Sequence, residues 1–242
     1  MRRTSIACTL ALLVALPAAA QTVDDIIAKN IAAKGGAAKL QAVKSIRMTG
    51  RMTVGPGIDA PIVIEVKRPK AMRVDFTVQG MVGSQAYDGT TGWNLMPFGG
   101  STVPQKMTAD EVTLAEEQAD MDGPLVDYRA KGHTVELLGK ETVEGAPAYK
   151  LKITLKNGVV RTVYLDAEHF LEIRQEGKRT IQGTEMDLES IIGDYKEVDG
   201  LMFPHSIDNG AKGAPQRQKI VIDKIEINPP IDDARFKMPD VK

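Results

Sequence analysis

The residue types that most often carry catalysis or hold a metal are few in this sequence and widely separated. Three histidines, His133, His169 and His205, fall in separate expected hairpins, without the paired spacing typical of metal ligands. The single cysteine, Cys8, lies in a segment that we expect to be removed. No serine sits in a nucleophile elbow, and no glycine-rich strand-to-helix loop forms a phosphate cradle. We therefore expect neither an enzyme nor a bound metal or cofactor.

The first twenty residues have the three parts of a secretory signal. Arg2 and Arg3 form a positive start, an apolar run covers residues 6–16, and small residues precede Gln21. The apolar run is too short to anchor the chain in a bilayer. We expect cleavage after Ala20, which divides the chain into a signal peptide, 1–20, and a single soluble domain, 21–242.

The charge of the remaining chain excludes one class of partner. Removal of Arg2 and Arg3 leaves 29 basic against 32 acidic residues, a net charge of −3. Neutralising phosphates requires a basic surface, so nucleic acid is not an expected partner. The remaining chain has no cysteine, and we expect its stability to come from its core rather than from disulfides.

Most of the chain shows the two-residue period of strands with one dry and one wet face. From Ser45 onward, apolar residues alternate with polar ones, and turn pairs such as Asn157-Gly158 and Asp199-Gly200 separate many of the segments. This predicts a mainly β fold, one large curved antiparallel sheet of about ten strands that forms an unclosed half-barrel. The expected strands cover 45–54, 62–66, 72–78, 82–88, 91–96, 134–143, 149–155, 159–165, 170–177, 183–191, 195–204 and 217–227.

Two helical regions are expected to cover this sheet. Residues 22–36 show helical spacing of Val23, Ile26 and Ile27 after a capping Thr22, and a short second helix follows. The capping-box pattern at residues 108–111 begins a central helix that runs to about residue 119. A concave sheet must be filled, either by its own side chains and these helices or by an apolar guest.

Two segments are more specific than the rest. Residues 66–73, Val-Lys-Arg-Pro-Lys-Ala-Met-Arg, form a basic turn between two alternating strands, where Pro69 ends the first strand. Residues 87–98 place an Asp-Gly turn before a strand that contains the single tryptophan, Trp93. On their own, these patterns indicate a charged surface hairpin and a tryptophan in the core.

In this order, and followed by a helical insertion, the two segments resemble the periplasmic lipoprotein carriers of the lipoprotein-localisation (LolA/LolB-like) family. In that family, a strand ending in Val-Lys-Arg-Pro precedes a hairpin Asp-Gly-x-Thr-Leu-Trp-x-Tyr-x-Pro-Phe. The C-terminal residues 233–239 are similar to the closing Ala-x-x-Phe-x-x-Pro segment of the family. The hairpin motif is matched at Asp88, Gly89, Thr91, Trp93, Pro97 and Phe98.

The resemblance implies a periplasmic, monomeric carrier that binds a lipid or lipoprotein acyl chain in an apolar cavity and transfers it toward the outer membrane. Membrane-bound donor and acceptor proteins would be its partners. In the carriers, the arginine of the Lys-Arg-Pro motif contacts backbone carbonyls of the helical lid, and the matching residue here is Arg68. The expected lipid-binding residues are Met48, Met52, Ile64, Met72, Val74, Phe76 and Trp93.

Two alternatives remain open at the sequence level. The same fold serves in envelope-stress sensors that act through protein contacts, without a transported ligand. A fully packed β domain, which would act as a structural or interaction module, also fits the alternation.

Overall fold

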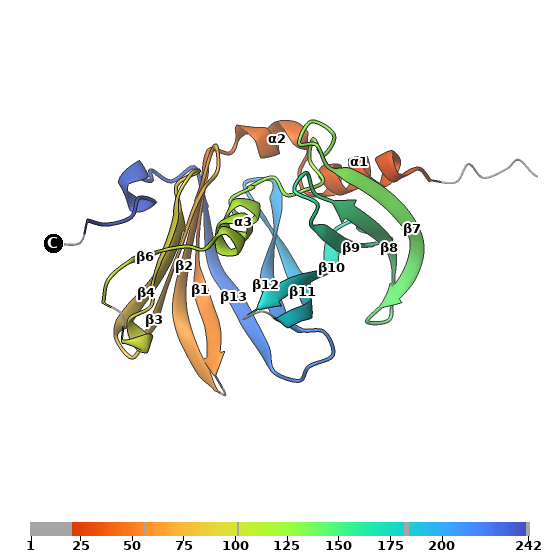
Figure 1. Ribbon diagram of the computed structural model, residues 1–242. Coiled ribbons are helices and arrows are strands. Elements are labelled where there is room, and N and C mark those ends of the chain that lie inside the picture. Colours follow the sequence, from red (N-terminus) through yellow and green to blue (C-terminus); the bar gives the residue numbers. More distant parts are fainter. Residues whose placement is uncertain (1–20, 56, 101, 182–183, 241–242) are drawn as a thin grey trace, which may run out of the picture.

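The computed structural model describes residues 21–240 apart from 56, 101 and 182–183, so the expected signal peptide lies outside the described residues. Within this part of the chain, thirteen strands form one antiparallel sheet that is not closed into a barrel. The sheet curves around the central helix, and two further helices lie along its upper end (Figure 1). The predicted fold class is confirmed.

The strands run in the order β6-β5-β4-β3-β2-β1-β13-β12-β11-β10-β9-β8-β7. Their bounds are β1 Ser45–Gly55, β2 Ile58–Lys67, β3 Ala71–Val78, β4 Met81–Tyr87, β5 Gly92–Leu95, β6 Gln105–Lys106, β7 Thr134–Val143, β8 Ala146–Thr154, β9 Val160–Asp166, β10 Glu172–Ile181, β11 Thr184–Val198, β12 Leu201–Ala211 and β13 Arg217–Ile227. The helices are α1 Val23–Ala33, α2 Ala37–Ala42 and α3 Ala109–Gln118, with short 3₁₀ turns η1 Pro97–Gly99 and η2 Asp233–Arg235.

Alternation along the strands gives the sheet two distinct faces. Cross-strand partners project to the same side of a sheet. Met48 pairs with Ile64, and Ile64 pairs with Val74, so these three residues share one face. We call the side that carries these residues the inner face, because the helices pack against it, and the opposite side the outer face. Arg73 and Glu65, which pair with each other, lie on the outer face.

The two halves of the sheet meet where β1 pairs with β13. Ile46 lies opposite Ile227 and Met48 opposite Ile225, so residues from near both ends of the described chain lie side by side. The register shifts between Thr49 and Gly50, where a Cβ on the glycine would come within 2.0 Å of a carbonyl oxygen on β13. Glycine is therefore required for the close approach of these two central strands.

The helices begin where the sequence predicts. Thr22 caps α1 and Thr108 caps α3, each in a capping box with an acidic residue three positions later. α1 buries Ile26 and Ile27 on the inner face of β8 and β9, in a cluster completed by Leu125 from the segment after α3. No helix of the described residues is both long and apolar enough to cross a membrane.

The predicted division between residues 183–191 and 195–204 is wrong. β11 continues through residue 198, because Asp194 takes a positive φ of 52° and forms an irregularity within the strand rather than a turn. The reversal occurs at Asp199-Gly200, both with positive φ, as expected for a tight hairpin turn.

Candidate functional site

The inner face carries a row of apolar side chains that the helices cover only in part. Four of the predicted residues on it, Met48, Ile64, Val74 and Phe76, are half-buried. Two others are buried: Met52, and Met72, which packs beneath α3. On the opposite half of the sheet, the row continues through half-buried residues of β11, β12 and β13. These are Leu188, Ile192, Ile207 and Ile220.

The central helix α3 rests on this face through a small apolar contact. Ala115 and Ala119, at the end of α3 and just after it, pack against Val66, Met72 and Tyr87. Alanines bury little area, so this contact holds the helix with only a modest hydrophobic contribution. Displacement of α3 would expose Met72 and Tyr87 and enlarge the apolar surface of the inner face.

Ion pairs hold α3 at both sides of the sheet. Lys70 donates to Glu116 at 2.7 Å, and Arg161 on β9 donates to Glu117 at 2.6 Å. The Lys70 pair is about half-exposed at both partners, which limits its contribution to about 0–1 kcal/mol. The hydrogen bond that Lys70 donates to Glu116 raises the pKa of Lys70.

Arg68 connects the β2–β3 turn to α2 and to the segment that follows α3; we call these two parts, together with α3, the helical cover. Its Nε donates to the carbonyl of Val43 at 2.6 Å, and Nη2 donates to the carbonyl of Leu40 in α2 at 3.0 Å. The same guanidinium forms a bidentate pair with Asp122, in the segment that follows α3, at 2.7 and 2.5 Å. The hydrogen bonds to Asp122 raise the pKa of Arg68. The side chain named from the resemblance thus contacts backbone carbonyls of the cover, and it also contacts a carboxylate.

Trp93 does not lie with the other predicted residues, so its assignment to the lipid-binding set is wrong. It pairs with Ala86, which pairs with Arg73, and all three belong to the outer face. Its Nε1 donates to the carbonyl of Phe236 at 2.9 Å, and only 1% of Trp93 is exposed. The C-terminal segment covers it, in a cluster of Phe236 and Ile231 with Ala71.

Outer-face carboxylates fasten that segment to the sheet. Glu65, buried on β2, receives hydrogen bonds from Arg47 at 2.8 Å and from Arg235 at 2.5 Å. Asp75 receives others from Arg73 at 2.9 Å and from Arg235 at 3.1 Å. The outer face of β2 and β3 is therefore a closed, structural surface.

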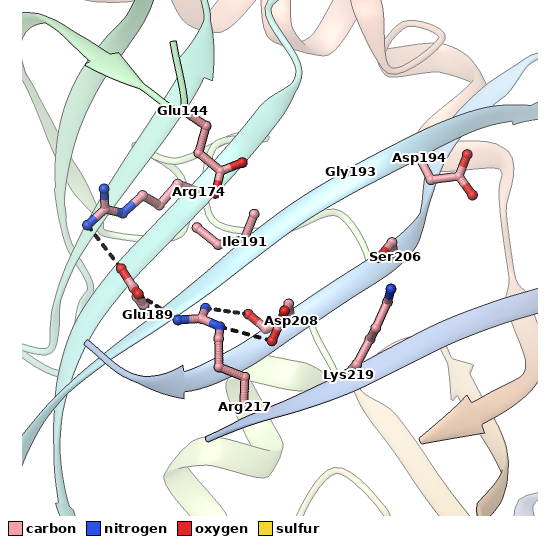
Figure 2. A pocket seen from close by; sticks show the side chains of 10 residues that line it. All are labelled: Glu144, Arg174, Glu189, Ile191, Gly193, Asp194, Ser206, Asp208, Arg217 and Lys219. Atoms are coloured by element: carbon pink, nitrogen blue, oxygen red, sulfur yellow. Dashed lines mark hydrogen bonds and ion pairs between the residues drawn. The ribbon is translucent and has the colours of Figure 1, made fainter. Parts of the chain in front are cut away.

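A polar cavity of about 610 Å³ lies on the outer face of β10 to β13. Figure 2 shows that some of its charges pair with one another, since Glu189 joins Arg174 to Arg217 and Arg217 also binds Asp208. A second cavity of similar volume lies beside the C-terminal segment, at Ser45 and residues 228–232. No cluster of His, Cys, Asp and Glu that could hold a metal occurs among the described residues. The candidate binding surface is the inner face, where the half-buried apolar row lies.

The sequence interpretation missed the charged residues of the inner face. It did not single out Arg161 or Arg179, and the expected strand 170–177 ends before Arg179. A detectable signal was the alternation itself, since Arg161 falls in phase with Val163 and Leu165 on β9. An arginine in phase with core residues requires a partner, and Glu117 is that partner.

The open antiparallel sheet with helices over its inner face is the fold of the LolA-like proteins. A domain from Vibrio parahaemolyticus, described as an outer membrane lipoprotein-sorting protein, superposes with a TM-score of 0.60 at 11% identity, over 88% of this chain and 94% of that one. A LolA superfamily protein from Nitrosomonas europaea gives a TM-score of 0.57 at 14% identity, over 90% and 98% of the two chains. No protein-family model and no curated protein matches the sequence. These superpositions, at TM-scores above 0.5, show a shared fold.

Proposed function

We propose that this protein is a periplasmic carrier that binds a lipid or lipoprotein acyl chain on its inner face and transfers it toward the outer membrane. It acts as a monomer and without covalent chemistry, and it exchanges its cargo with membrane-bound donor and acceptor proteins. The secretory pattern of residues 1–20 supports the location. The shared fold with a lipoprotein-sorting domain supports the cargo class.

The single observation that carries the proposal is the half-buried apolar row of the inner face. Met48, Ile64 and Val74 lie in register across three neighbouring strands, and their side chains keep part of their surface uncovered. An acyl chain in water gains about 0.8 kcal/mol for each methylene that it buries. A continuous apolar row can supply that burial along the length of a chain.

The way α3 is held supports reversible binding. Its buried apolar contact consists of Ala115 with Ala119 just after the helix, and Val112 packs partly buried beside them. Two ion pairs and a hydrogen bond from Asn94 to Glu111 add polar contacts. The exposed Lys70–Glu116 pair exchanges with water at small net cost, and the alanine contact is small, so this side of the helix can move aside for a guest and return. A carrier needs this property, because it must release its cargo as well as bind it.

The test uses a neutral apolar fluorescent probe, methyl cis-parinarate, titrated into delipidated protein. We expect saturable binding, and loss of the probe on addition of phospholipid vesicles. Val74→Arg should abolish binding, because it places a charge in the middle of the apolar row. Val63→Arg is the matched control, since Val63 pairs with Asp75 on the outer face.

Both variants are first checked for native circular dichroism and cooperative unfolding. Absence of probe binding by the folded wild-type protein would remove the proposed function in favour of a module that acts through protein contacts. Equal loss of binding in Val74→Arg and Val63→Arg would show that the apolar row is not the binding surface.

A further inference from the structure

The inner face carries a second arginine beside the Arg161–Glu117 pair. Arg161 on β9 lies opposite Gly177 on β10. Arg179 also lies on β10, two residues after Gly177. Because alternate residues of a strand share a face, Arg179 projects to the inner face, opposite Met186 on β11. It lies near the end of β10, away from α1 and α2.

Arg161 has an anionic partner. Its side chain, 10% exposed, lies across Gly177, where an added Cβ would come within 2.4 Å of Nη1 and 3.1 Å of Cδ. Its Nη2 binds Glu117 of α3 at 2.6 Å. The glycine thus makes room for Arg161 to extend over β10, and the carboxylate compensates its charge.

Arg179 has no such partner. It is half-buried, and of the described residues none accepts a hydrogen bond from its guanidinium. Burial lowers its pKa, the charge of Arg161 lowers it further, and only the charge of Glu117 opposes them. Arg161 and Arg179 therefore share the single carboxylate of Glu117, which leaves one positive charge uncompensated. This charge is half-buried, so it attracts an anion more strongly than it would in water.

Apolar side chains adjoin this charge. Met186 pairs with Arg179, and Leu188 and Ile192 continue along β11 on the same inner face, all half-buried. A surplus cation near one end of an apolar row matches a molecule with an anionic head and a hydrocarbon tail. A guanidinium binds both carboxylate and phosphate through paired N–H donors.

We propose that Arg179 binds the anionic head group of an amphiphile whose tail lies along the apolar row of the inner face. This inference rests on the proposed function, since it names the chemical class of cargo for the same surface. It distinguishes anionic amphiphiles, such as fatty acids and lipids with a phosphate head, from neutral ones.

The test compares cis-parinaric acid with its methyl ester, two probes that have the same tail and differ in charge at neutral pH. We expect wild-type protein to bind the acid about tenfold more tightly, which corresponds to one net charge-assisted contact. Arg179→Gln should remove this preference and leave the affinity for the ester unchanged. Arg51→Gln, on the exposed outer face, is the control for overall charge and should keep the preference.

Competition identifies the head group. The proposal is supported if dodecanoate, dodecyl phosphate or both displace parinarate at concentrations where dodecanol does not. Equal affinity for acid and ester in wild-type protein, or a preference that persists in Arg179→Gln, overturns it while the carrier function stands. Failure of both probes to bind wild-type protein overturns the carrier function itself.

Discussion

The contact between Arg68 and Asp122 allows a direct test of how the helical cover is held. Asp122→Ala removes the carboxylate and leaves Arg68 with its two backbone acceptors, the carbonyls of Leu40 and Val43. α2 should therefore stay attached to the β2–β3 turn. The segment that includes α3 should open more often.

The geometry sets the size of the effect. Two charge-assisted hydrogen bonds are lost, between side chains that are 30% and 12% exposed, so solvent screens the pair only partly. We take the net contribution as about 1.5–3 kcal/mol, which raises the population of the open form by about 10- to 150-fold. The exposed pair of Lys70 and Glu116 should contribute about 0–1 kcal/mol, so Glu116→Ala, on α3 itself, is the matched control.

Amide hydrogen exchange followed by mass spectrometry measures this opening. Peptides within residues 108–133 should exchange about 10- to 150-fold faster in Asp122→Ala and at most a few-fold faster in Glu116→Ala. Peptides from β13 should keep the wild-type rate in both variants. Wild-type exchange of residues 108–133 in Asp122→Ala, or an equal increase throughout the sheet, would refute the idea that this pair holds the cover.

Two further predictions concern the outer face. Phe236→Ala should lower the free energy of unfolding by about 3–5 kcal/mol, because it removes a buried side chain that anchors the C-terminal segment. The emission of Trp93 should shift to longer wavelength, because the same segment supplies the carbonyl that accepts a hydrogen bond from its indole. Urea unfolding followed by tryptophan fluorescence measures both, and unchanged emission would contradict the docking of this segment. Burial alone would raise the pKa of Asp75, but hydrogen bonds from Arg73 and Ser84 outweigh it and lower the pKa. Its contribution is therefore present at neutral pH and is lost as the pH falls below about 4, so urea unfolding between pH 7 and 3 should show a flatter acid limb in Asp75→Asn than in wild type.

The fold class and the helix starts could be predicted because local rules decide them. The two-residue period that begins at Ser45 and the capping boxes at Thr22 and Thr108 depend only on neighbouring residues, and the structure contains all three. The end of β11 could not be placed in this way. The irregularity at Asp194 and the turn at Asp199 have the same positive φ, and only pairing with β12 distinguishes them.

The position of Trp93 shows where sequence reasoning went wrong. A short strand with one aromatic residue does not reveal which side of the sheet it faces. The hairpin does, since Tyr87 pairs with Gly92 and places Trp93 opposite Ala86, on the side of Arg73. The cover over Trp93 comes from residues about 140 positions away, and no local pattern indicates that contact.

The pairing of β1 with β13 constrains the order in which the chain can fold. Strands β1 to β6 can form hairpins early in synthesis, yet the free edge of β1 finds its partner only when residues 217–227 have emerged. Until then, a row of unpaired amides beside apolar side chains is open to other chains, which is a known route to aggregation. Loss of the last few dozen residues would therefore leave the molecule divided at its middle rather than merely shortened at one end.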